Sequence, residues 1–223
     1  MLFLHSAHMW LTACEAKNRA VAEATQDPNA WPSDTVTAIV LAAASTEAFI
    51  NELAESVAFA AAGPEAAMLS AELLNFSSVL EEVESSRGSL TLKYLLAAQT
   101  LTGTSFDKSA NPYQDFAVLV MLRNDLMHIK PRDKFVSDAP QGAVLEVPKY
   151  IVGLQQRGLA RTPDSGVLMS WFNRLQTAHM AAWATKTSRD IILAVLAMIP
   201  DDPNSATDPS YFFKKQFRNP PLT

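Results

Sequence analysis

The sequence predicts an all-α protein whose helices pack into a bundle, and three observations support this fold class. Hydrophobic residues make up 48% of the chain, alanine is prominent and only seven glycines occur. This composition favours helices packed closely through small residues. Apolar residues also recur at helical spacing along most of the chain. Proline and glycine stand between these stretches, where they end helices.

Six long helices are expected between these breaks. The second begins at a capping residue, Ser33 or Asp34, and stops at Gly63-Pro64. The segment 131–165 is rich in proline and glycine; its pieces 135–136 and 144–147 can form a small hairpin, followed by a short helix at 148–158. The six long helices are expected over residues 2–26, 34–62, 65–86, 89–102, 113–129 and 166–199.

A single domain is expected over residues 1–200, because the sequence contains no repeat and no linker. The tail 201–223 is polar and rich in proline, which predicts an extended or partly disordered segment. No uninterrupted apolar run is long enough to cross a bilayer. The richest, 191–200, has about half of the required length, so we expect no membrane contact.

The net charge and the single cysteine limit the function classes. A formal charge of −5 argues against a protein that coats nucleic acid, but not against an enzyme with one local basic pocket. Cys14 is the only cysteine, so an intramolecular disulfide and a zinc site made of several thiolates are excluded. Residues 11–14 look like a lipoprotein cleavage box, yet no lysine or arginine precedes them. We therefore expect a cytoplasmic protein without metal or other cofactor.

The residues best suited to chemistry are Arg123, Asn124 and His128, at the polar end of an apolar helix. At about 100° per residue, Asn124 and His128 share one helix face. Such a set can cut RNA without a metal. Histidine can take the proton of the attacking 2′-hydroxyl or give one to the leaving oxygen, and a guanidinium stabilises the charge that grows on the phosphate. Asn124 can orient the histidine or bond the phosphate.

Basic residues follow this set directly in the sequence. Together with Arg123 and Lys134, Lys130 and Arg132 give residues 123–134 a surplus of positive charge, four basic residues against Asp125 and Asp133. Positive charge attracts the phosphates of RNA. We therefore expect Lys130 and Arg132 to bind substrate.

The stretch Arg123-Asn124-x-x-x-His128 resembles the R-N-x-x-x-H signature of the HEPN superfamily of ribonucleases. Residues 45–52, with Glu47 and Asn51, resemble the early HEPN helix that carries an acidic residue and an asparagine. The segment from Lys93-Tyr94 to 113–116 resembles the approach to the signature helix, so the similarity covers about residues 34–131.

The resemblance implies a helical bundle that forms a homodimer, with two copies of the signature facing each other across a cleft. It also implies a metal-independent endoribonuclease, often a toxin with a cognate antitoxin or a defence effector, and adds Glu47 and Asn51 as cleft residues. One departure is that Lys130 stands where members regulated by a nucleotidyltransferase commonly have tyrosine.

Structural alternatives remain open for the same residues. His128 can simply cap the helix end, with Arg123 in a surface ion pair. Glu47 and Asn51 either orient Arg123 or His128, or bond each other and a neighbouring helix in the core. The alternative function is a non-catalytic HEPN-like dimer that binds a nucleotide, an RNA or a protein partner through the same cleft; a purely structural helical adaptor is a third possibility.

Overall fold

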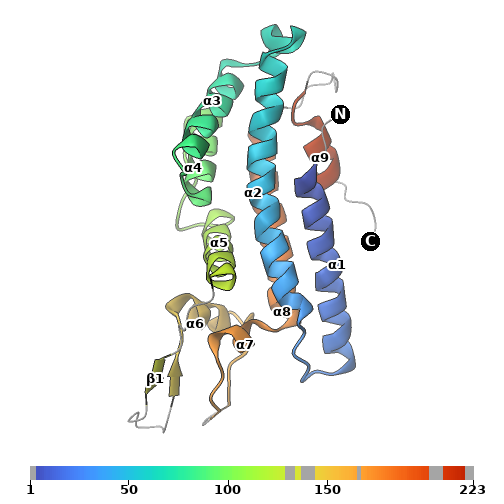
Figure 1. The fold of residues 1–223 in the computed structure, drawn as a ribbon, viewed down its shortest axis with the longest axis vertical. Coiled ribbons are helices and arrows are strands. Elements are labelled where there is room, and N and C mark those ends of the chain that lie inside the picture. The colour runs from blue at the N-terminus through green and yellow to red at the C-terminus, as the bar shows by residue number, and fades with distance from the viewer. Residues whose placement is uncertain (1–3, 129–133, 137–143, 165–166, 201–207, 219–223) are drawn as a thin grey trace. The chain divides into compact units, whose positions relative to one another are not determined.

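The computed structural model describes residues 4–128, 134–136, 144–164, 167–200 and 208–218. Over these residues the chain is an all-α helical bundle with one small hairpin, as the sequence predicts (Figure 1). The helices are α1 His5–Gln26, α2 Asp34–Ala61, α3 Ala71–Ser85, α4 Leu90–Thr102, α5 Tyr113–Met127, α6 Lys149–Gln156, α7 Trp171–Leu175, α8 Ala178–Ala197 and α9 Tyr211–Arg218.

The hairpin and the helix starts follow from local sequence signals. Strands β1 Lys134–Val136 and β2 Val144–Glu146 pair antiparallel, with Phe135 opposite Leu145. Ser70 and Ser89 cap α3 and α4, since each hydroxyl accepts the amide hydrogen of the residue three positions on. A 3-10 helix over Pro64–Met68 occupies the start of the predicted third helix, so α3 begins later than expected.

The described residues divide into two compact units. Unit 1 comprises 1–10, 43–120 and 187–223, and unit 2 comprises 11–42 and 121–186, each within the described ranges. Both units are assembled from segments far apart in the sequence. The prediction of one domain over residues 1–200 stays a prediction.

The core of unit 1 is built around aromatic rings. Phe49 of α2 is fully buried and meets the rings of Phe213 and Phe217 at centroid distances of 5.4 and 6.0 Å. Tyr94 of α4 and Phe116 of α5 are equally buried, with centroids 4.4 Å apart. Such tilted and edge-on ring pairs add to the burial energy. The helices α3 and α4 lie side by side in this unit (Figure 1).

The core of unit 2 contains a close contact between small residues. Ala16 and Ala20 of α1, Ala38 of α2 and Ala181 of α8 form one cluster and are fully buried. Methyl side chains let helix backbones approach closely and bury surface without losing rotamer entropy. The alanine-rich composition is therefore used in packing.

The predicted last helix, 166–199, is wrong as a single helix, because it is broken between α7 and α8. Ser170 caps α7 through a hydrogen bond from the Asn173 amide at 3.3 Å. Thr177 then starts a new helix: its hydroxyl accepts the Met180 amide hydrogen at 3.1 Å and donates to the Leu159 carbonyl at 2.6 Å. A capping threonine favours a helix start over a helix interior.

The expectation of an extended tail is wrong for residues 211–218, which form α9. This helix turns Phe213 and Phe217 into the core of unit 1 and leaves Phe212 59% exposed. Arg189 of α8 donates to the carbonyls of Phe217 and Arg218 at 3.0 and 3.2 Å, and so satisfies the end of α9. Proline content predicted a loose tail, whereas the spacing of the phenylalanines decides the outcome.

Among the described residues, α2 is the one helix long and apolar enough to cross a membrane by length and composition. The 18-residue stretch concerned is 56% buried inside the protein, and the core helix of a soluble protein passes the same test. Polar residues such as Glu47 and Glu52 interrupt α2, which is why the sequence alone points to 191–200 as the richest uninterrupted stretch. The expectation of no membrane contact stays a prediction.

We expect Phe217→Ala to lower the free energy of unfolding by about 3–5 kcal/mol, because it removes a buried ring and leaves a cavity. The matched control is Phe212→Ala on the same helix, whose ring is mostly exposed and whose loss should cost about 0.5 kcal/mol or less. Denaturant unfolding of both variants measures the difference. Equal effects would show that α9 does not stabilise unit 1.

Burial raises the pKa of the Tyr94 hydroxyl well above its ordinary value. The native state thus keeps this proton where the unfolded chain releases it, so the contribution of Tyr94 to stability is complete below about pH 10 and declines above it. We expect Tyr94→Phe to flatten the loss of stability between about pH 9 and about pH 11, measured by urea unfolding. A slope in Tyr94→Phe equal to that of the wild type would contradict this role of Tyr94.

Candidate functional site

Helix α5 carries the predicted catalytic residues at its C-terminal end. One face of this helix is apolar and buried, with Phe116, Leu119, Leu122 and Leu126 at helical spacing. His128 stands in the turn that follows the helix, and its amide donates to the Asn124 carbonyl at 3.0 Å. The helical hydrogen-bond pattern thus continues to His128, which places its side chain one turn beyond Asn124.

The structure brings Arg123 and Asn124 into direct contact. The Arg123 guanidinium donates through Nη1 to the Asn124 Oδ1 at 3.1 Å. Arg123 is half-buried, while Asn124 and His128 are exposed. All three side chains belong to unit 2, and solvent reaches them. Asn124 therefore orients the guanidinium, and its amide nitrogen carries two N–H donors of a kind that suits a phosphate oxygen.

From the sequence, Asp125 is expected only to offset the neighbouring positive charges. In the structure it also has a structural role. It is 8% exposed, and its carboxylate accepts a hydrogen bond from the hydroxyl of Tyr150 on α6. Both residues lie in unit 2. The sequence signal for this role is the position of Asp125, three residues after the buried Leu122 and so on the inner side of the helix. A carboxylate on that side needs a partner. The identity of that partner, 25 residues further on, could not be read from the sequence.

The other predicted substrate-binding residues are placed differently or not at all. Lys130 and Arg132 lie outside the described residues, so their role stays a prediction. Glu47 and Asn51 lie on α2 in unit 1, whereas the signature residues lie in unit 2. Their proposed action on Arg123 or His128 stays a prediction as well.

Asn51 takes part in a polar cluster of unit 1. Its Oδ1 accepts a hydrogen bond from Lys93 Nζ at 2.7 Å, and the same ammonium forms an ion pair with Glu84. Lys93 is 3% exposed, so its charge depends on these acceptors. Asn51 therefore bonds a neighbouring helix, which is the structural alternative named for it.

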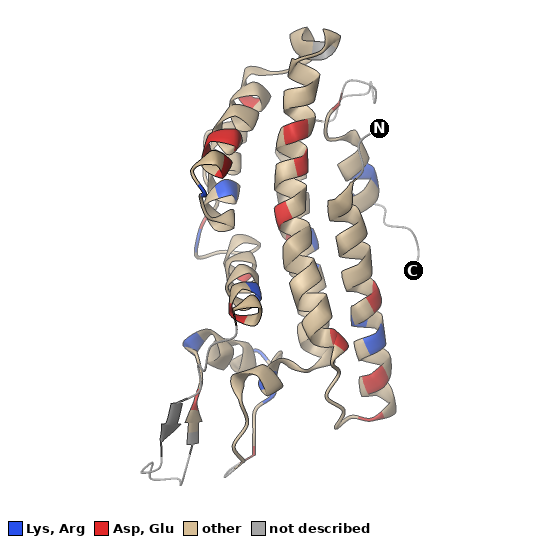
Figure 2. Cartoon of the chain, in the orientation of Figure 1, with Lys and Arg blue, Asp and Glu red and all other residues tan. Residues whose placement is uncertain are grey.

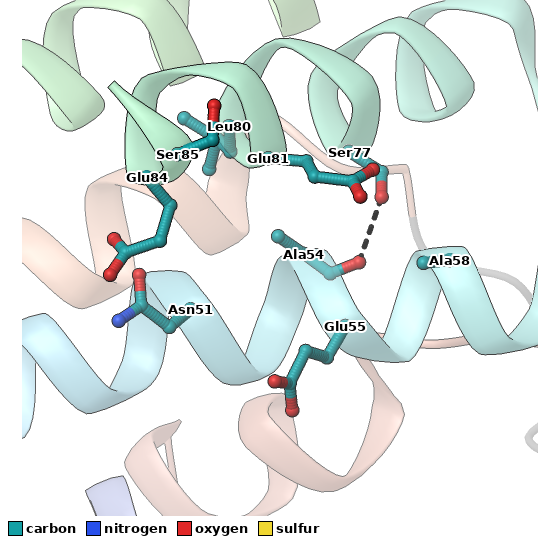
Figure 3. A pocket seen from close by; sticks show the side chains of 9 residues that line it. All are labelled: Asn51, Ala54, Glu55, Ala58, Ser77, Leu80, Glu81, Glu84 and Ser85. Carbon is teal, nitrogen blue, oxygen red and sulfur yellow. Dashed lines mark hydrogen bonds between the residues drawn. The ribbon is translucent and has the colours of Figure 1, made fainter. Parts of the chain in front are cut away.

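Asn51 and Glu84 also line a cavity of about 480 Å³ between α2 and α3 (Figure 3). Its walls bring together three glutamates with alanine, leucine, serine and asparagine side chains. They are Asn51, Ala54, Glu55, Ala58, Ser77, Leu80, Glu81, Glu84 and Ser85. Acidic residues gather on this part of α2 and α3 (Figure 2). Three carboxylates repel a phosphate, so this cavity is a poor place for RNA.

The fold and site thus define an all-α helical bundle with a half-buried arginine and an exposed asparagine and histidine at the end of one helix. Within the described ranges, no group of three or more histidine, cysteine or carboxylate residues is arranged to hold a metal ion. Neither protein-family models, nor curated proteins, nor solved structures match the chain. The function is therefore inferred from the chemistry of the residues themselves.

We expect Asn51→Ala to lower the free energy of unfolding by about 1–3 kcal/mol, because the buried Lys93 ammonium loses an acceptor. Asn124→Ala is the matched control; its side chain is exposed, and its loss should cost about 0.5 kcal/mol or less. Chemical denaturation measures both. Should Asn51→Ala prove as mild as the control, the cluster would not be a structural element.

Proposed function

We propose that the protein is a metal-independent endoribonuclease of the HEPN type that acts as a homodimer. The observation that carries the proposal is the solvent-accessible set at the end of α5, where Arg123 contacts Asn124 and His128 stands one turn further on. Together these groups provide a permanent cation, an amide and an imidazole that can accept or donate a proton. The resemblance of this set to the HEPN signature gives it a specific chemistry.

Histidine side chains carry out the two proton transfers of the proposed reaction. An imidazole takes the proton of the 2′-hydroxyl as its oxygen bonds to phosphorus, and an imidazolium gives a proton to the departing 5′-oxygen as the P–O bond breaks. In a homodimer the two copies of His128 supply the base and the acid. The products are a 2′,3′-cyclic phosphate and a 5′-hydroxyl.

Arg123 provides the electrostatic part of the catalysis. Negative charge grows on the non-bridging phosphate oxygens in the transition state, and a guanidinium can meet two of them with paired donors. The hydrogen bond from Arg123 to Asn124 limits the conformations of a long side chain, so less entropy is lost when phosphate binds. Lys130 and Arg132 would extend the positive charge along the RNA.

The biological setting is part of the same proposal and rests on the resemblance alone. It is that of a cytoplasmic toxin or defence effector, kept inactive by a cognate antitoxin. Lys130 occupies the position of the tyrosine that is modified in some members, so control by adenylylation at that position is not proposed.

The test is cleavage of RNA in the presence of a chelator. We expect the wild type to release 2′,3′-cyclic phosphate ends and His128→Ala to cleave at least about 100-fold more slowly, because general acid–base catalysis contributes about 10²–10⁴. Arg123→Ala should lose about 10²–10³. The control is His179→Ala, which removes an exposed histidine of α8 in the same unit and should keep full activity.

Three outcomes would contradict the proposal. Cleavage that requires a divalent ion would reject metal independence, and cleavage unchanged by His128→Ala would reject the site. RNA binding without cleavage, lost on Arg123→Ala but kept on His128→Ala, would favour the non-catalytic binding module. Thermal unfolding of each variant must match the wild type for any of these comparisons to count.

A further inference from the structure

The buried Asp125 and the half-buried Tyr150 form a hydrogen-bonded pair in the same unit as the proposed site. Asp125 stands within the signature, one residue after Asn124 and three before His128. Its carboxylate accepts the hydrogen bond of the Tyr150 hydroxyl, and it is 8% exposed although both of its signature neighbours are exposed. The Asp125 carboxylate therefore lies on the inner side of α5. In the sequence it is close to Arg123 and His128, which in the proposed reaction contact the negatively charged substrate phosphate.

The direction in which the Asp125 side chain points affects the proposed site. Residues three apart on a helix are surface neighbours, so an aspartate that turned outward could approach His128. There it would compete with the substrate phosphate for the imidazolium, and it would also repel that phosphate. A hydrogen bond that holds the carboxylate inward therefore favours the transition state, in which the negative charge on the phosphate oxygens grows.

Tyr150 comes from an element that is itself well anchored. Ile151 and Leu154, which follow it on α6, are fully buried or nearly so. Gln155 of the same helix donates to the Arg161 carbonyl at 2.8 Å, and its side-chain oxygen accepts from Arg174 of α7 at 3.4 Å. A hydroxyl on such a helix has few alternative positions, so it can define where the Asp125 carboxylate lies.

We propose that Tyr150 is a positioning residue of the RNA-cleaving site, which acts through Asp125. Its hydroxyl holds the Asp125 carboxylate on the inner side of α5 and fixes the last turn of the helix, so that Arg123 and His128 meet the substrate phosphate without a competing anion. The catalytic part of this inference rests on the proposed function. The structural part, the fixing of the last turn, does not.

The kinetic test compares Tyr150→Phe with Tyr113→Phe. Tyr113 is a matched control because it also bonds another segment through its hydroxyl, to the Thr91 carbonyl at 3.3 Å, from the opposite end of α5. We expect Tyr150→Phe to lower kcat about 10-fold with KM within about twofold, as for an interaction that matters in the transition state. Tyr113→Phe should leave both constants unchanged.

A rescue experiment separates positioning from simple loss of a bond. Asp125→Asn keeps an oxygen that can accept from Tyr150 and removes the charge, so alone it should leave kcat within about threefold of the wild type. Combined with Tyr150→Phe it should recover most of the lost kcat, because the residue released from tyrosine is then neutral. A double variant as slow as Tyr150→Phe, or a Tyr150→Phe variant as fast as Tyr113→Phe, would overturn the proposal.

A second readout does not depend on cleavage. The His128 amide, bonded to the Asn124 carbonyl, should exchange its hydrogen about 10-fold faster in Tyr150→Phe than in the wild type or in Tyr113→Phe, because the last turn opens more easily. A protein that cleaves no RNA but shows this difference would reject the proposed function and retain the fixing of the helix end. Unchanged exchange would overturn that fixing role even in a protein that cleaves RNA.

Discussion

The burial of α2 is the constraint on which the rest of the structure depends. Apolar residues occupy its inner positions, and the polar residues among them must find partners because water cannot reach them. Glu52 shows how this is met: its carboxylate accepts the His5 amide at 2.7 Å and the Ser6 hydroxyl at 2.6 Å. The buried Glu52 side chain of α2 therefore caps the start of α1. Its charge, which would be costly without partners, links the two helices. The Thr46 carbonyl makes a similar link by accepting the Tyr94 hydroxyl at 2.9 Å.

The helices could be predicted from the sequence where periodicity and stop signals agree, as for α2, α4 and α5. The prediction failed where two signals compete. Thr177 lies inside a long apolar pattern, yet its hydroxyl caps a helix start, and that preference becomes visible only with its partner, the Leu159 carbonyl, in place. In α9 the proline-rich surroundings concealed Phe213 and Phe217, whose spacing of four residues gives a short helix one apolar face.

The candidate site, too, could be predicted only in part from the sequence. The placement of Asn124 and His128 on one face follows from helical geometry, so the exposed set could be anticipated. The partners of Asn51 and Asp125 could not, because they depend on which helices become neighbours. Lys93 and Tyr150 are ordinary residues in the sequence, and each gains its role by reaching a polar group that the fold has buried.

The docking of α9 has a consequence for how the chain is made. Phe217 covers both Phe49 and Trp10, at ring distances of 6.0 and 5.7 Å, so the last helix closes a core that begins near the first residues. Synthesis proceeds from the N-terminus, so Trp10 and Phe49 are made well before Phe217. Unit 1 thus cannot complete its core before α9 has been made, and until then it carries an uncovered aromatic surface of the kind that chaperones bind.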